Sequence, residues 1–200
     1  MRERSTDRMK VRLADALWAC LAQTPLGDLS VGDVIDAAGV SRGSFYYHFS
    51  DLDHLTAWAV REELLDSDRR GNSFLVLAAC EPEPNLEPRV ERSIERICLL
   101  LDRGGMSAVY GVALDVTLGL WERALCPEGG SLPDEVVAQI EYSVGGTVGM
   151  LSRAGVSTDA KRRVSVAFIH ERHLWTVRRV SEVLGRSPRE LVGCLEGAVA

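Results

Sequence analysis

Helical spacing of apolar residues is the feature that most constrains the fold of this 200-residue chain, because strand-like alternation is nearly absent. Apolar positions from Met9 to Leu21 share one helical face, and the turn sequence Thr24–Gly27 ends that helix. The pattern predicts about ten helices, no strand and therefore an all-α fold. The later helices are expected at about 31–38, 41–49, 52–70, 74–80, 90–103, 106–125, 132–155, 159–184 and from 188 onward. Ser50, Ser131 and Ser187 are the expected caps of the helices that begin near 52, 132 and 188.

Composition excludes several classes of protein. The chain is 46% hydrophobic and 26% charged with a net charge of −6, which is typical of a globular protein and argues against a globally basic nucleic-acid coat. Its five cysteines are scattered without a Cys-x-x-Cys pair, so neither a zinc ribbon nor a disulfide framework is indicated. With no apolar export segment at the start, the sequence predicts a cytoplasmic protein, and no cofactor is expected.

The longest apolar stretch, residues 106–120, contains Asp115 and falls short of the roughly 20 apolar residues that span a bilayer. We therefore expect it to form a helix buried inside the protein, with no membrane partner.

Two short capped helices joined by a glycine stand out after the first helix. Ser30 with Asp33 forms a capping box, and Gly39 suits the left-handed conformation that ends a helix. Ser41 then caps a second helix that runs through Phe49. A longer helix followed by such a pair predicts a helix-turn-helix, whose second helix enters a DNA groove.

Residues 29–55 resemble the DNA-binding signature of the tetracycline-repressor (TetR) family, most strongly in Gly-Val-Ser-Arg-Gly-Ser-Phe-Tyr-Tyr-His-Phe at 39–49. The resemblance covers about residues 6–60. It implies a helix-turn-helix DNA-binding domain over 1–50, built as a three-helix head, and a helical ligand-binding and dimerisation domain over 51–200. It further implies a homodimeric transcriptional regulator, expected to be a repressor and not an enzyme. Such a protein would bind a palindromic operator in double-stranded DNA and be released by a small-molecule effector.

Carried over by position, the resemblance assigns base contacts to the start of the recognition helix and phosphate contacts to its flanks. The predicted DNA-binding residues are Ser30, Ser41, Arg42, Gly43, Ser44, Tyr46, Tyr47 and His48. Arg42 is the only lysine or arginine between Arg12 and Arg61, and arginine pairs bidentately with guanine, so we expect it to read a base.

The chain departs from the family pattern at Leu52, where a phosphate-binding lysine is usual; His54 or arginines of the N-terminal arm are candidates to compensate. Residues 1–60 hold six basic and eight acidic groups, but five of the basic ones lie within the first twelve residues. We expect this basic arm to supply attraction for phosphates, with a solvated tail as the alternative.

The resemblance places an effector pocket among the helices of about residues 52–125. Candidate lining residues are the aromatic side chains and the one carboxylate in the apolar stretch, namely Trp58, Phe74, Tyr110, Asp115 and Trp121, with Trp175 as a further aromatic. Plain core packing is the alternative for the aromatics, and an ion pair to another helix is the alternative for Asp115. Residues 61–158 carry nine basic and sixteen acidic groups, which favours a cationic effector unless these charges only solvate helix faces.

Two apolar stripes in the last long helices predict the dimer interface, because two such helices from each chain can form a four-helix contact. Its predicted residues are Ile140, Val144, Val148, Leu151, Val166, Ile169, His173, Val177, Val180 and Leu184. The alternative is that these stripes belong to the internal core.

Two other functions fit the sequence less well. His170 and His173, one turn apart, raise the hypothesis of an all-helical metal-binding or enzymatic bundle without DNA binding, although no second ligand pair is evident. A helical interaction module without DNA binding is the third hypothesis.

Overall fold

The computed structural model describes residues 2–65, 88–153 and 157–199; for 2–7, 88–90, 158–167, 169–170 and 199 only the backbone is described. Within these ranges there are nine α-helices, one short 3-10 helix and no strand, which confirms the all-α prediction. The elements are α1 (Arg2–Leu21), η1 (Leu26–Asp28), α2 (Val31–Ala38), α3 (Arg42–His48), α4 (Leu52–Leu64), α6 (Pro88–Asp102), α7 (Met106–Leu125), α8 (Asp134–Leu151), α9 (Thr158–Leu184) and α10 (Pro188–Val199).

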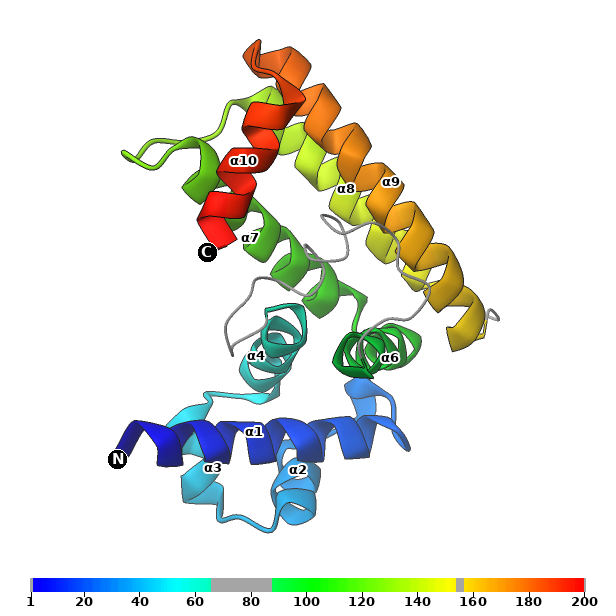
Figure 1. Cartoon of the computed structure of the whole chain (residues 1–200). Coiled ribbons are helices and arrows are strands. Elements are labelled where there is room, and N and C mark those ends of the chain that lie inside the picture. Colours follow the sequence, from blue (N-terminus) through cyan, green and yellow to red (C-terminus); the bar gives the residue numbers. More distant parts are fainter. Residues whose placement is uncertain (1, 66–87, 154–156, 200) are drawn as a thin grey trace.

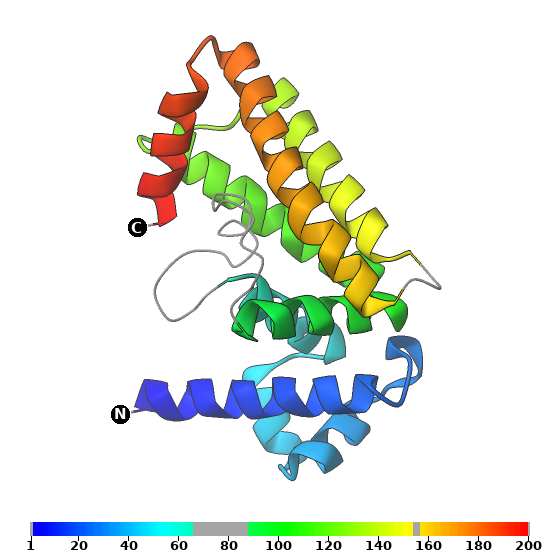
Figure 2. The same ribbon diagram turned by 45° about the vertical axis from the view of Figure 1, so that its right-hand side comes forward.

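The helices are arranged in three tiers along the molecule (Figure 1). Helices α1, α2 and α3 form a head at one end, and α4 and α6 lie between this head and the remaining helices. Helices α8 and α9 run antiparallel, side by side along one edge, as both Figure 1 and Figure 2 show. Helix α7 passes through the centre of the upper tier and contacts α4, α6, α8 and α10.

Helix α7 is the predicted apolar helix, and its apolar face lies in the core. Val112, Val116, Leu120 and Trp121 are all buried on it. No helix in the described ranges is both long and apolar enough to cross a lipid bilayer.

Several helix ends differ from the sequence prediction. Helix α4 is capped by Asp51 rather than Ser50, because the carboxylate of Asp51 accepts the backbone N–H of His54 at 2.7 Å. The same helix ends at Leu64 rather than at residue 70. Helix α8 starts after Pro133 without the expected cap from Ser131, and it ends at Leu151 rather than 155. The predicted helix over 74–80 lies outside the described residues.

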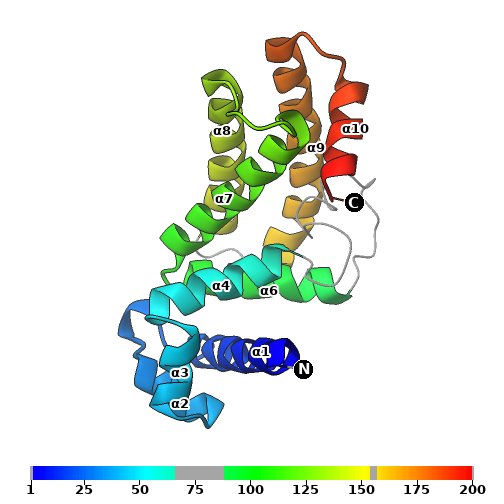
Figure 3. The ribbon, with the colours of Figure 1, turned by 90° about the vertical axis from the view of Figure 1, so that its left-hand side faces the viewer.

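A buried polar network joins the head to the middle tier. The Glu63 carboxylate of α4 accepts hydrogen bonds from Ser93 at 2.7 Å and from Arg96 at 2.6 Å, both on α6. The second guanidinium nitrogen of Arg96 donates to Asp15 of α1 at 2.9 Å, and the guanidinium lies 5.6 Å from the ring centroid of Trp18. One arginine therefore ties α6 to both α1 and α4, which adjoin α6 in Figure 3.

Glu63 and Asp15 stabilise the charged form of Arg96. Burial alone would lower the pKa of Arg96, but the hydrogen bonds and charges of Glu63 and Asp15 raise it above its ordinary value. A second link lies at the end of α1, where Leu26 N–H donates to the Arg103 carbonyl and Arg103 donates to the Ala22 carbonyl, each at 2.9 Å.

Candidate functional site

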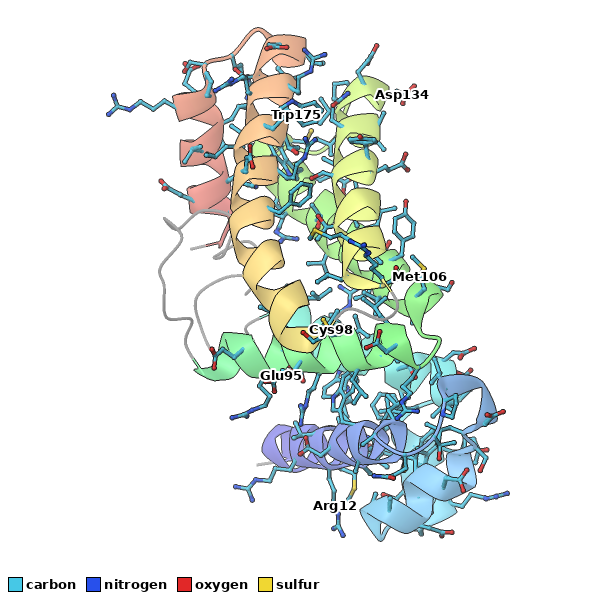
Figure 4. The ribbon with its side chains drawn as sticks, turned by 90° about the vertical axis from the view of Figure 1, so that its right-hand side faces the viewer. Arg12, Glu95, Cys98, Met106, Asp134 and Trp175 are labelled. Atoms are coloured by element: carbon cyan, nitrogen blue, oxygen red, sulfur yellow. The ribbon has the colours of Figure 1, made fainter. Side chains whose placement is uncertain are left out.

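The turn between α2 and α3 is fixed by local hydrogen bonds. Gly39 adopts φ +61°, which is inexpensive only for glycine, and the N–H of Val40 donates to the Ile35 carbonyl at 3.2 Å. Arg12 of α1 donates to the Gly39 carbonyl at 3.4 Å, and Figure 4 shows its side chain extending from α1. These bonds hold α2 and α3 at a set angle against α1.

Helix α3 has one face in the core and one face in solvent. Phe45 and Phe49 are buried against the other helices of the head. Arg42 and Gly43 are exposed at its start, while Tyr46 and Tyr47 are 51% and 76% exposed near its end. A short rigid helix thus presents a cation and two phenols away from the rest of the molecule.

The two serines that precede the helices act as caps. Ser41 accepts the backbone N–H of Ser44 at 3.1 Å, so its hydroxyl proton stays available to an outside acceptor. Ser30 instead donates its hydroxyl to Asp33 at 2.7 Å, and the backbone N–H of Ser30 donates to the same carboxylate at 2.8 Å. A hydrogen bond from Ser30 to a phosphate would therefore require its hydroxyl to turn away from Asp33. These bonds also hold the pKa of Asp33 below its ordinary value, so the group is charged.

His48 lies half-buried at the end of α3. Burial lowers its pKa, and the positive charge of Lys10 on α1 lowers it further, so the ring is neutral at pH 7. His48 can share a hydrogen bond with a phosphate but brings it no charge. Lys10, whose ammonium lies 5.8 Å from the ring centroid of Trp58, is the cation that the fold brings to this end of α3.

The position of the usual lysine is filled differently. Leu52 is half-buried and packs against the core of the chain. His54 accepts the backbone N–H of Ser50 at 3.3 Å and meets the Phe49 ring edge-on at 5.3 Å, so it braces the α3–α4 turn.

Among the described side chains of the head, exposed carboxylates outnumber exposed cations. The exposed acidic residues of the segment after α1 are Asp28, Asp33, Asp36, Asp51 and Asp53. Arg8 is exposed on α1, and the side chains of Arg2 and Arg4 lie outside the described residues. Attraction to phosphates therefore depends on a small set of basic side chains.

A capped pair of short helices with one exposed polar face, braced by a longer helix, defines the DNA-binding domain of a helix-turn-helix regulator. Residues 13–57 match the sequence model described as bacterial regulatory proteins, tetR family. The match covers less than half of the chain; it supports a TetR-family regulator and implies a DNA-binding transcriptional regulator. No curated protein matches the chain significantly.

A cavity of about 80 Å³ lies in the other half of the molecule, between α4, α6, α7, α8 and α9. Its wall is largely apolar and includes Leu64, Ile97 and Trp121. The polar side chains on the wall come from three helices and are Thr117, Ser143, Thr147, Arg172, His173 and Thr176.

Of the predicted pocket residues, Trp121 lines this cavity and three others lie elsewhere. Trp58 packs at the contact of α4 with the head, 5.8 Å from the ring of Phe49. Tyr110 lies half-buried where α7 meets Gly145 of α8. Phe74 lies outside the described residues.

Asp115 points away from the cavity. Its side chain is 71% exposed and lies 3.9 Å from Arg61 of α4, as an ion pair to another helix. An exposed carboxylate needs no buried partner, so its place in an apolar helix carries no sign of a ligand.

Most of the described residues of the predicted dimer stripes lie inside the chain. Six of these residues are buried within the chain, namely Ile140, Val144, Val148, Leu151, Val177 and Val180. His173 lines the cavity, and Leu184 packs half-buried against the core. The side chains of Val166 and Ile169 are not described. Helix α7 packs on α8 and α10 packs on α9, so burial within one chain accounts for the described stripe residues, which periodicity alone does not reveal.

A metal site gains no support from the described residues, among which no group of three histidine, cysteine, aspartate or glutamate side chains gathers. The side chain of His170 is not among them.

Two polar features were missed by sequence reasoning. The first is the Glu63–Arg96–Asp15 network, and the second is Arg172 on the cavity wall. The one local signal for the second is Trp175, three residues later, on whose ring the guanidinium of Arg172 lies at 4.0 Å.

Proposed function

We propose that this regulator is a homodimeric repressor that binds a palindromic operator and leaves it when a small-molecule effector fills the cavity of the C-terminal half. The observation that carries the proposal is the exposed face of α3 in one half, combined with a cavity in the other half whose wall includes Leu64 of α4. Helix α4 follows the recognition helix directly, so one element spans the distance between the two sites.

On DNA, the start of α3 would lie in the major groove. Arg42 would pair with a guanine edge, and the hydroxyls of Ser41 and Tyr47 would donate to phosphates. Lys10 would supply the charge that the family's lysine gives elsewhere, since Leu52 has none.

Dimerisation would use the outer face of the α8–α9 pair. Exposed apolar side chains on this pair include Tyr142 at 67%, Leu174 at 51% and Val183 at 41%. Gly146 and Gly149 are exposed on α8 and would allow a partner helix to approach closely. Two recognition helices related by a two-fold axis would then read two half-sites.

Coupling would pass through the middle tier. Leu64 and Ile97 on the cavity wall are sequence neighbours of Glu63 and Arg96, which hold α1 through Asp15. A ligand that favours a different position of α4 or α6 would change the position of the head, provided that it binds the two conformations with unequal affinity.

Selection of bound duplexes from random DNA tests the proposal. We expect an inverted repeat to emerge, with the protein sedimenting as a dimer and binding the repeat as one dimer. A protein that selects no sequence, or that binds its best duplex as a monomer, contradicts the proposal. Screening of small molecules for release of the selected operator then tests the response.

A further inference from the structure

We infer that the cavity of the C-terminal half takes a small organic anion, a carboxylate on a short apolar body, with Arg172 as the group that binds its charge. This inference rests on the proposed function, because it names the chemical class of the effector.

The polar chemistry of the cavity wall is one-sided. None of the described residues that line it is an aspartate or glutamate, although the middle of the sequence is rich in acidic residues. Arg172 contributes a permanent positive charge to the same wall. A cationic ligand would therefore meet a like charge and no counter-ion among the described lining residues.

The hydroxyl groups on the wall are largely engaged. Thr117, Thr147 and Thr176 each donate to a carbonyl of their own helix, at 2.7, 2.9 and 2.9 Å. Their protons are thus unavailable to a ligand, and their oxygens offer only acceptor sites. A ligand acceptor must look to another donor.

Ser143 and His173 are further polar side chains on the wall, but among the described lining residues Arg172 is the one with a permanent positive charge. Its Nη2 is buried and has no hydrogen-bond partner among the residues that the structure describes. A buried N–H group without an acceptor is costly, and such groups are rare in folded proteins. A carboxylate oxygen placed in the cavity would satisfy it with a charge-assisted hydrogen bond.

Two aromatic rings hold the guanidinium in position. The guanidinium carbon lies 4.0 Å from the ring centroid of Trp175 and 5.8 Å from that of Tyr142. Figure 4 labels Trp175 where α9 faces α8. Stacking stabilises the charge but gives the N–H groups no acceptor, so it fixes the direction of the donor without using it.

The rest of the cavity wall determines the size and polarity of the ligand's uncharged part. Ile97, Val116, Trp121 and Ile140 provide much of the apolar part of the wall. The volume of about 80 Å³ is roughly half that of the ~150 Å³ cavity that holds benzene in another protein, which favours a short aliphatic body.

Calorimetric titration of the full chain tests the inference with butanoate, hexanoate and octanoate, each compared with the alcohol and the amine of equal length. We expect at least one acid to bind at least about tenfold more tightly than its alcohol, and the amines to bind no better than the alcohols. Equal affinity for acid and alcohol, tighter binding of an amine, or no binding of any acid would overturn the inference.

Arg172→Met tests the assigned residue, since methionine keeps much of the apolar stem and its contact with Trp175. We expect acid affinity to fall at least about tenfold, to the level of the alcohol, while alcohol affinity is unchanged. Retained alcohol binding and an unchanged circular dichroism spectrum show that the variant is folded. Arg172→Lys, which restores a charge without the planar fork, should recover part of the acid affinity and serves as the second variant. Arg189→Met, which removes an exposed arginine on α10, is the matched control. Acid binding that is unchanged in Arg172→Met overturns the assignment.

The two proposals fail in different ways. A protein that binds its selected operator but prefers no acid contradicts only the ligand class. A protein that binds an acid through Arg172 but selects no DNA, or whose operator affinity the acid leaves unchanged, contradicts the proposed regulation and leaves the cavity chemistry standing.

Discussion

Arg42 and Tyr47 face outward from the same short helix, but they are suited to different parts of a duplex. A guanidinium can pair with two acceptors on one base edge, whereas a single phenol donates to a phosphate without regard to sequence. The buried pair Phe45 and Phe49 fixes the rotation of the helix, so the outward side chains are presented in a defined direction.

Replacement of Arg42 should therefore affect specificity more than general DNA affinity. We expect Arg42→Ala to weaken binding of the selected operator by roughly 1–3 kcal/mol and to relax the preference at one base step, while binding to a scrambled duplex changes little. Fluorescence anisotropy with both duplexes measures the two effects. Arg123→Ala, an exposed arginine of α7, is the control. Unchanged binding of both duplexes by Arg42→Ala would reject the role.

His48 links the stability of the head to pH. Because its pKa is lowered in the folded chain, mainly by burial, the unfolded chain takes up the proton first as the pH falls. The stability that His48 contributes is complete above its unfolded pKa of about 6.5 and is lost as the pH falls below that value. Urea unfolding between pH 7 and pH 5 should show a larger loss for the wild type than for His48→Gln. Parallel loss in both proteins would contradict the assignment.

At the scale of elements, helix α6 connects the head to the cavity. Arg96 binds Asp15 of α1 and Glu63 of α4, and its neighbour Ile97 lines the cavity. A shift of α6 or α4 thus moves the contact that holds α1 in place.

Removal of this arginine should loosen the head. We expect Arg96→Met to lower the free energy of unfolding by about 2 kcal/mol, because it leaves the buried carboxylate of Glu63 without its cation, although the partial exposure of Arg96 moderates the loss. Operator affinity should fall as well, since the orientation of the head is less fixed. Urea unfolding and anisotropy measure both, with Arg92→Met, an exposed arginine of α6, as the control. If Arg96→Met is as stable as the control, the contacts of Arg96 with Glu63 and Asp15 do not stabilise the head.

The helices also show which features could be predicted from the sequence and which could not. Ser30, Gly39, Ser41 and Ser187 act on groups within a few residues, so the helix-turn-helix and the start of α10 were predicted correctly. The face of α8 that contains Ile140 could not be assigned in this way, because α7 and α9, distant in sequence, decide whether it lies inside or outside. Arg172 was missed for the same reason, since five helices make its surroundings.

At the scale of the whole molecule, the outer face of α8 and α9 is where a second copy would lie. The side chains that remain exposed there differ from the predicted stripes, and Leu174 is the apolar one at a central position of α9. A charge at this position would be buried without a partner in a dimer.

We expect Leu174→Asp to shift the protein toward monomer in sedimentation experiments and to weaken binding to the two-half-site operator, while the folded content stays the same. Affinity for an isolated half-site should be unchanged, because α3 lies in the other half of the molecule. Val11→Asp, which places the same charge on an exposed position of α1, should leave the oligomeric state unaltered. A dimer that persists in Leu174→Asp would move the interface to another face.

The carboxylates exposed on the segment after α1 bear on how such a regulator finds its target. Proteins that slide along chromosomal DNA rely on many sequence-independent contacts to phosphates. With five exposed aspartates after α1 against Arg8, Arg12 and Arg42 as exposed arginines among the described side chains of the head, this surface would attract DNA of random sequence only weakly. It would release random stretches quickly and reach its site by repeated three-dimensional encounters, so few copies would be held in reserve on irrelevant DNA.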